Sequence, residues 1–374
     1  MALRLLEKTL SVMKMKQQEV NSQLVLLARE FRGLSQEDLA VKANVTQSAV
    51  SQLEKGNSVA IGQDKLTKIF EALEFPERFF YSDEPRLSFG SSSYFYRKKI
   101  TKASERNFVS GIVNLFRMHL STMLTIVEVE STNPLPKETV NEDNNPSQIA
   151  QTVRDIWGIP DGPVQNLTHY VEKAGIVIVE CPFGTDKIDG TSVNYNNLPP
   201  IIFINNSLPP DRYRFTLAHE LGHIVMHDIP HERMEEEADA FASSLLMPSK
   251  DFLRSIASSS AGRVNIQQLI KLKPLWKTSI ASMIVRLHDT GRISDSEYRN
   301  MYISLSKMKL NRNEPQPFRK ERPALFPQIV EACLGDYRFA KNNAESILGI
   351  YSDDFKLLYG ALLPEPKLKI VSRA

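Results

Sequence analysis

The chain has 374 residues, with 46 Lys plus Arg against 44 Asp plus Glu and a formal net charge of +2. This length suits two or three domains, and the near-zero charge favours neither an acidic nor a basic partner. Two cysteines are too few for a disulfide framework, and no apolar run approaches the roughly 18 residues of a membrane span. Without a leader-like cleavage site at the start, we expect a cytoplasmic protein with no membrane partner.

The first domain is expected over residues 18–82 and is all-α. A helix through residues 24–32 is predicted to stop at Gly33. Ser35 is predicted to cap a short second helix and Thr46 a third. Two short helices joined by a tight turn make a helix-turn-helix, whose second helix enters the DNA major groove.

This segment resembles the XRE (Cro/phage repressor-like) family, with Gln-Glu-x-Leu-Ala at residues 36–40 and Ser-x-x-Ser-x-Leu-Glu-x-Gly at 48–56. The resemblance implies binding to double-stranded DNA as a homodimer on two half-sites. The side chains expected to meet base edges are Gln47, Ser48, Ser51 and Gln52, and those expected to meet phosphates are Gln36 and Lys55. The alternative is a helical bundle that binds protein.

Residues 83–146 are expected to form a linker followed by one long helix. Apolar residues recur every three or four positions over residues 102–130, which predicts an amphipathic helix for dimer or domain packing. A further domain is then expected over residues 147–250. A buried strand is predicted at residues 175–180 and another at Ile201–Asn205, the latter at the sheet edge beside a helix that carries a metal site.

That helix contains the run His219-Glu220-Leu221-Gly222-His223, an H-E-x-x-H sequence. Residues four apart lie on one face of a helix, so both imidazoles can bind one metal ion with Glu220 beside them. The pattern predicts a zinc site with an open position, where His219 and His223 are ligands and Glu220 is the catalytic base for an attacking water. The alternative is a helix with two surface histidines.

The third ligand is expected from the next helix, which begins in the acidic run Glu235-Glu236-Glu237 and ends at Pro248. Because Glu235 and Asp239 are four apart on the edge of an Ala-rich face, Glu235 is predicted as the ligand. Asp239 is then the acceptor that orients a ligating histidine, and Glu236 and Glu237 face solvent. The alternative is an acidic helix start without metal. Zn²⁺ is the expected cofactor, with Mn²⁺ or Fe²⁺ as alternatives.

Three other residues are candidates for contact with substrate. His219, His223 and His227 form a ladder, but two steps of four residues cover about 12 Å, too far for one ion at about 2 Å from each ligand. His227 is therefore not a zinc ligand and is expected to cap the helix, bond a neighbour or help hold substrate. His231 in the following loop could reach the open position, and Tyr195 is a candidate oxyanion donor.

These motifs together resemble the ImmA/IrrE family of zinc metallopeptidases, through residues 189–192, Ile201–Asn205, 214–223 and 235–248 in that order. The resemblance implies a thermolysin-like (gluzincin) site in a small α+β domain that acts on a transcriptional repressor. In that family the two motif histidines and the glutamate of the second helix bind zinc. An edge strand of such enzymes binds the substrate backbone by strand addition, a role we expect for Ile201–Asn205.

The C-terminal region, residues 251–374, is expected to be helical. Two helices with a sharp turn near Lys277 and Thr278 predict a second helix-turn-helix-like unit. From residue 262 to 322, 13 Lys plus Arg against 5 Asp plus Glu leave a surplus of eight basic residues. This surplus favours either contact with DNA or an acidic partner, or a solvated surface over the peptidase.

The fold class expected is therefore multidomain and mainly α, with the α+β peptidase domain between helical regions. Two functional hypotheses follow from the sequence. In the first, a DNA-binding regulator carries a zinc endopeptidase that cleaves a repressor-like protein by Glu220-assisted attack of water at the zinc. In the second, a non-proteolytic regulator or antitoxin binds DNA and a toxin-like partner, and its peptidase-like domain is a structural or sensing module.

Overall fold

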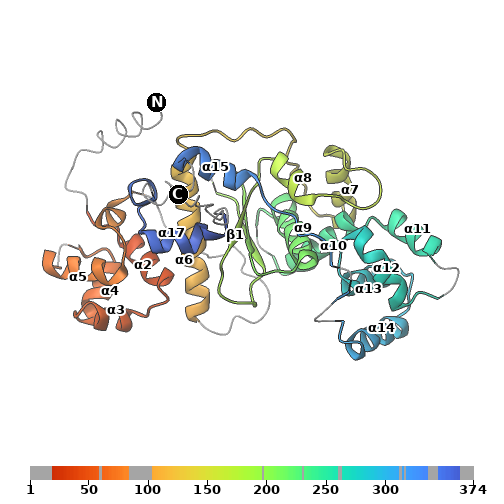
Figure 1. The fold of residues 1–374 in the computed structure, drawn as a ribbon, viewed down its shortest axis with the longest axis horizontal. Helices are drawn as coiled ribbons and strands as arrows, with labels where there is room; N and C mark the ends of the chain where they lie inside the picture. Colours follow the sequence, from red (N-terminus) through yellow and green to blue (C-terminus); the bar gives the residue numbers. More distant parts are fainter. Residues whose placement is uncertain are drawn as a thin grey trace, which may run out of the picture. The chain divides into compact units, whose positions relative to one another are not determined.

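Figure 1 shows the computed structural model of the chain. It describes residues 19–58, 61–83, 103–195, 198–229, 231–259, 263–310, 314–315, 317–335 and 344–362. These residues fall into two compact units, unit 1 within Met1–Ser88, Lys99–Val129 and Pro327–Ala374, and unit 2 within Phe89–Lys98 and Glu130–Phe326. Among the described residues, no helix combines the length and hydropathy needed to cross a bilayer.

Unit 1 begins with α2 (Ser22–Phe31), α3 (Gln36–Lys42), α4 (Gln47–Glu54), α5 (Gln63–Leu73) and the 3-10 turn η2 (Glu77–Tyr81). Gly33 follows α2 at φ +66°, a conformation that glycine adopts without strain. Ser35 and Asp38 form a reciprocal capping box at the start of α3, and the Thr46 hydroxyl accepts the Ala49 N–H at the start of α4. The predicted helix-turn-helix is thus confirmed as α3 and α4.

The long helix of the expected linker is α6 (Ala103–Met123), which ends earlier than predicted. Residues 125–127 leave the helix in turns that bond to the carbonyls of residues 122 and 123. This stretch is Thr-Ile-Val, and β-branched residues propagate a helix poorly. Residues 84–102 of the expected linker lie outside the described part of the chain.

Helix α6 packs inside unit 1. A side chain at Gly111 would lie 2.7 Å from the Phe31 Cα, so the absence of a side chain permits the close approach of α6 to α2. On another side, His119 lies against α17 (Ser352–Tyr359), where its Nδ1 atom is 2.8 Å from the Tyr359 hydroxyl. Helix α15 (Leu325–Leu334) also contacts α6, because the Cys333 thiol donates to the Met123 carbonyl. Figure 1 shows α15 and α17 in blue beside α6. Residues of the expected C-terminal region therefore complete unit 1.

Unit 2 contains a three-stranded sheet of β1 (Val177–Cys181), β2 (Gly190–Val193) and β3 (Ile201–Asn205) in the order β1-β3-β2. β1 runs parallel to β3 with Val177 opposite Ile201, and β2 runs antiparallel to β3 with Gly190 opposite Ile204. The expectation that Ile201–Asn205 forms the edge beside the metal-site helix is wrong. β3 is paired on both sides, and all five of its residues are buried. The edge strand that packs on that helix is β2.

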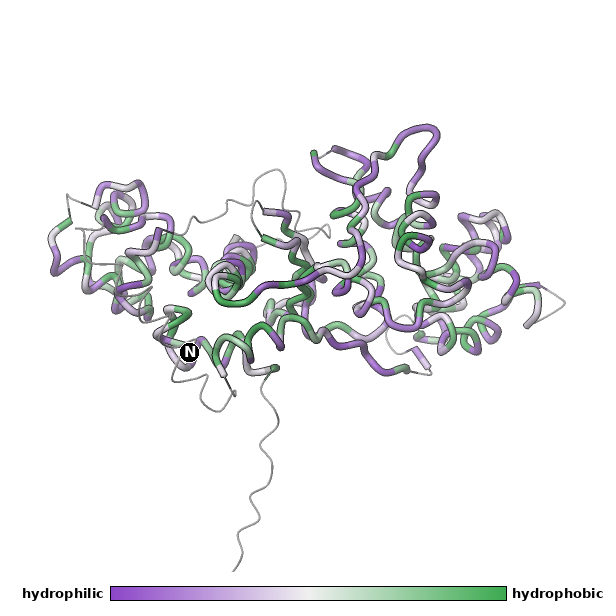
Figure 2. Tube along the Cα trace, turned by 90° about the horizontal axis from the view of Figure 1, so that it is seen from above, coloured by the Kyte–Doolittle hydropathy of each residue, from purple (hydrophilic) through white to green (hydrophobic). Residues whose placement is uncertain are grey.

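Helices pack around this sheet. They are α7 (Pro146–Ile156), α8 (Leu167–Lys173), α9 (Pro210–Met226), α10 (Met234–Leu246), α11 (Ser249–Ser259), α12 (Ile266–Trp276), α13 (Ile280–Asp289) and α14 (Asp295–Lys307). Green and purple residues alternate along the helices in Figure 2, as expected where one face is buried. The predicted sharp turn before α13 is confirmed at Lys277, which has φ +52°.

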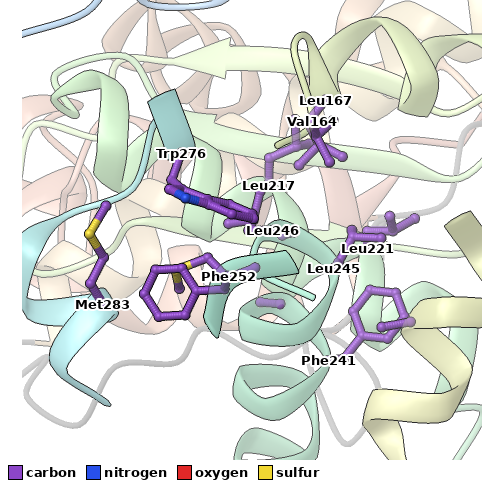
Figure 3. Packing of buried hydrophobic residues seen from close by; sticks show 14 of the residues in the cluster. Val164, Leu167, Leu217, Leu221, Phe241, Leu245, Leu246, Phe252, Trp276 and Met283 are labelled. Carbon is purple, nitrogen blue, oxygen red and sulfur yellow. The ribbon is translucent and has the colours of Figure 1, made fainter. Parts of the chain in front are cut away.

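One hydrophobic core runs from the sheet side of α8 and α9 to α13, as Figure 3 shows. Phe252 of α11 and Trp276 of α12 pack edge to face at 5.3 Å between ring centroids, and Met283 of α13 belongs to the same cluster. Helices α11 to α14 therefore share the core of unit 2. The basic surplus counted there is reduced by one, because the buried Lys273 also pairs with Asp211, which lies outside the counted segment.

Candidate metal centre and nucleic-acid interface

Helix α9 carries the H-E-x-x-H residues and packs on α10. Pro209 and Pro210 start the helix, and the close approach of the two helices depends on Gly222, where a Cβ would lie 3.0 Å from the Phe241 ring. His219 and His223 follow one another on the face toward α10, and Glu220 is 5 % exposed. The packing of α9 on α10 thus sets where these side chains meet.

The side chains of His219, His223 and Glu235 converge. The two Nε2 atoms lie 3.0 Å apart, the His219 Nε2 is 3.5 Å from Glu235 Oε2, and the His223 Nε2 is 3.4 Å from Glu235 Oε1. A tetrahedral ion with ligands at about 2.0–2.1 Å places them roughly 3.3 Å from one another. The three separations are close to that value.

One carboxylate oxygen at the centre lacks a hydrogen-bond partner, which also fits a bound cation. The Glu235 Oε1 atom is buried and accepts no hydrogen bond. A buried carboxylate oxygen without a partner is costly, and a metal ion would satisfy it. Two imidazole nitrogens and a carboxylate form a donor set typical of zinc sites with an open position. The residues present therefore fit a divalent metal.

Each of the two histidines is held through its other ring nitrogen. The His219 Nδ1 lies 2.8 Å from Asp239 Oδ1, the orienting contact predicted from the spacing. The His223 Nδ1 lies 2.9 Å from the His227 Nδ1, and the His227 Nε2 lies 3.2 Å from Glu237 Oε2. If Nε2 of each ligating histidine faces the metal, its N–H is on Nδ1 and donates outward, to Asp239 or to His227.

The expectation that Glu237 faces solvent is wrong, whereas Glu236 is exposed as expected. The Glu237 side chain is only 8 % exposed and contacts both His227 and His231. It lies on the buried side of α10 next to Ala238, a position where a carboxylate is tolerated because two imidazoles pair with it. Sequence reasoning missed it because its partners come from outside α10.

Electrostatics at the centre follow from burial and charge. Burial raises the pKa of Glu220, while His223 and His219 oppose the rise. Burial would raise the pKa of Glu235 as well, but the neighbouring imidazoles of His219 and His223 lower it to about 2. Burial and the neighbouring His223 lower the pKa of His227 to about 4, so that His227 is neutral. A neutral His227 can accept the His223 N–H.

Strand β2 lies directly beside Glu220. A Cβ at Gly190 would be 3.5 Å from the Glu220 Cγ and 2.7 Å from the Thr216 Cγ2, so glycine allows the strand to approach α9. The Ser192 hydroxyl bonds to Glu220. Ser192 was part of the sequence match but had no predicted role. The sheet edge and the metal-binding face of α9 therefore meet at Glu220.

The remaining candidate residues do not belong to the cluster of His219, His223 and Glu235. His227 and His231 gather with Glu237 on the other side of His223. Tyr195 lies half-buried in the loop after β2, and its carbonyl accepts the Leu198 N–H. Roles for His227, His231 and Tyr195 in substrate binding remain predictions.

In unit 1, α4 exposes part of the surface expected to read DNA. Gln47, Ser48, Gln52 and Lys55 are exposed and Ser51 is half-buried, while Ala49, Val50 and Leu53 face the core. The Gln36 side chain donates to Glu54 and accepts from Gln47, so it links the start of α3 to both ends of α4. Glu54 is held in turn by a bidentate pair with Arg29. This network fixes the orientation of α4.

Two family profiles match the chain. Residues 26–80 match the helix-turn-helix family, and residues 171–288 match the peptidase M78 family, described as the IrrE N-terminal-like domain. The chain therefore carries an XRE-type helix-turn-helix domain fused to an ImmA/IrrE-type peptidase domain, and both resemblances are confirmed. The second match supports a metal-dependent peptidase class and extends through α13. No curated protein matches the chain.

Proposed function

We propose that the chain is a DNA-binding transcriptional regulator whose unit 2 is a zinc-dependent endopeptidase that cleaves one specific protein partner of the repressor type. The helix-turn-helix match supports the first half. One observation carries the second: ligand atoms of His219, His223 and Glu235 lie within 4.8 Å of one another, with Glu220 buried beside them.

The reaction assigns a role to each group. A divalent ion held by His219, His223 and Glu235 would polarise the substrate carbonyl and make water a stronger nucleophile at neutral pH. The Glu220 carboxylate takes a proton from the water as the new C–O bond forms. It then gives the proton to the amine nitrogen as the C–N bond breaks. Asp239 and His227 keep the two imidazoles oriented throughout.

The substrate is proposed to bind as an extended segment along β2. Within the described residues β2 pairs only with β3, so its other edge is available for strand addition. Gly190 and Ser192 place this strand against Glu220. The same function was predicted for β3, but a strand paired on both sides cannot accept another.

The test replaces the proposed base. Glu220→Gln removes the group that accepts the proton but keeps nearly the same shape. New protein N-termini are compared by mass spectrometry between cells that produce the wild type and cells that produce Glu220→Gln at equal level. At least one cleavage present only with the wild type is expected. Identical sets of N-termini, with metal bound in both proteins, would overturn the endopeptidase.

A second candidate is the non-proteolytic regulator or antitoxin, in which the metal centre is a sensing element. The exposed polar face of α4 favours it, since reading DNA as a homodimer needs no peptide hydrolysis. The two candidates separate in one comparison of target-gene expression. If the centre only senses metal, Glu235→Ala changes expression and Glu220→Gln does not. If proteolysis controls the gene, both change it.

A further inference from the structure

A second group of ligand-type side chains lies beyond His223. The His227 Nε2 is 3.2 Å from Glu237 Oε2, and the His231 Nε2 is 3.6 Å from the same oxygen. One ligand atom from each of the three residues lies within 4.8 Å of the others. His227 ends α9, His231 is in the loop, and Glu237 is on α10, so three separate elements contribute to the group.

Burial makes this group more than a surface cluster. The side chains of His227 and Glu237 are 3 % and 8 % exposed, whereas that of His231 is 44 % exposed. A carboxylate so deeply buried needs a cationic or hydrogen-bonding partner. The exposed His231 gives a route by which an ion can enter. Donor separations of 3.2 and 3.6 Å again bracket the roughly 3.3 Å expected between ligands of tetrahedral zinc.

We propose that His227, His231 and Glu237 form a second divalent-cation site, distinct from the catalytic centre. Two imidazoles and one carboxylate suit Zn²⁺ and other borderline cations better than Mg²⁺ or Ca²⁺. With three protein ligands and one side open to solvent, the site binds its ion more weakly than the enclosed centre. It therefore fills only when the cation is in excess.

The two sites are coupled by one proton, a step that rests on the proposed first site. A neutral imidazole carries one N–H. If His223 binds metal through Nε2, its proton lies on Nδ1, and the His227 Nδ1 at 2.9 Å must accept it. The His227 proton is then on Nε2, the atom needed by the second site.

Filling the second site reverses this arrangement. With a cation on the His227 Nε2, the proton lies on the His227 Nδ1 and the His223 Nδ1 becomes the acceptor. His223 then carries its proton on Nε2, toward the first site, where a ligand must have a free lone pair. Each ion therefore weakens the binding of the other, so the second cation binds more weakly while the first centre is filled.

Zinc titration of the tag-free, metal-stripped full chain against a chromophoric chelator tests the proposal. The wild type should bind one zinc tightly and a second more weakly, and His231→Ala should lose only the weaker one. Because His231 is exposed, this variant is expected to fold. His288→Ala is the matched control, since His288 is a half-buried histidine bonded to Asp295 on α14, and it should bind as the wild type does.

The coupling has its own readout. The double variant His219→Ala with Glu235→Ala should lose the tightly bound zinc. The zinc affinity of its remaining, weaker site should then rise by about 5-fold or more. A wild type that saturates at one zinc, or an His231→Ala isotherm that matches the wild type, would overturn the second site. Failure of the first metal centre, on which the coupling rests, is distinguishable, because it would show as a missing tight zinc in the wild type. Failure of the endopeptidase would show only in the comparison of Glu220→Gln with the wild type.

Discussion

The Nδ1 atom of His223 lies 2.9 Å from the Nδ1 atom of His227. His227 follows His219, the first histidine of the motif, by eight residues. This contact places a third histidine behind the metal-binding face rather than on it, and Glu237 anchors its far side. The ladder of histidines along α9 is therefore divided by role. His219 and His223 face Glu235, whereas His227 contacts His223 from the other side.

His227→Ala is expected to weaken metal binding at the first centre by about 10- to 100-fold, because His223 loses the acceptor that fixes its ring and tautomer. Competition with a chelator of known affinity measures the change. Asp239→Asn should produce a similar loss through His219. If His227→Ala binds zinc as tightly as the wild type, the contact has no orienting role.

Gly222→Ala is expected to destabilise unit 2, since the new methyl group would lie 3.0 Å from Phe241 and 3.4 Å from the Ala238 Cα. A cost of about 1–3 kcal/mol is typical of overpacking. Both tryptophans of the chain, Trp157 and Trp276, are buried in this unit, so their fluorescence in urea follows its unfolding. Gly62→Ala in unit 1, with nothing within 4 Å, should leave this transition unchanged.

The bidentate pair of Arg32 with Asp354 ties α2 to α17 at 2.6 and 2.7 Å. Asp354→Ala leaves the Arg32 guanidinium without its carboxylate and should cost unit 1 about 3 kcal/mol. Hydrogen exchange of the full chain should show faster exchange in both helices. Asp353→Ala removes an exposed neighbour of the same type and should exchange like the wild type. Unchanged protection in Asp354→Ala would contradict the assignment of α17 to the stability of this unit.

Substitutions on α4 should separate base reading from phosphate binding. Gln52→Ala is expected to cost about 1–3 kcal/mol on a site selected from a random DNA library and little on unrelated DNA. Lys55→Ala should weaken binding to both and lower the salt slope by about 1. Lys250→Ala, an exposed lysine of unit 2, is the control. Equal losses on selected and unrelated DNA for Gln52→Ala would show that it reads no base.

Short-range patterns predicted much of the fold. The caps at Ser35 and Thr46 and the turn at Lys277 are local, so their residues are enough to place the starts of α3 and α4 and the break before α13. The spacing of His219, Glu220 and His223 fixes their shared face for the same reason. The helical period of the next segment likewise predicted that Glu235 and Asp239 lie on one edge of their helix.

Features that depend on pairing between distant elements were not predictable. The sequence of β3 is a continuous apolar run, which fits an edge strand packed on a helix as well as a central one, and only pairing with β1 and β2 decides. Glu237 reads as a solvated acid within an acidic run, since its partners His227 and His231 reach it from other elements. The pairing of Glu237 with these two histidines depends on the tertiary structure, which the local sequence does not specify.

The most direct measurement of the central claim is the metal content of the tag-free chain by mass spectrometry, beside His223→Ala, Glu235→Ala and Glu236→Ala. Our account predicts about one tightly bound zinc per chain in the wild type and in Glu236→Ala, whose carboxylate is exposed, and none in the other two. A wild type that cannot be loaded with zinc, manganese or iron, or zinc retained by Glu235→Ala, would contradict the proposed metal centre.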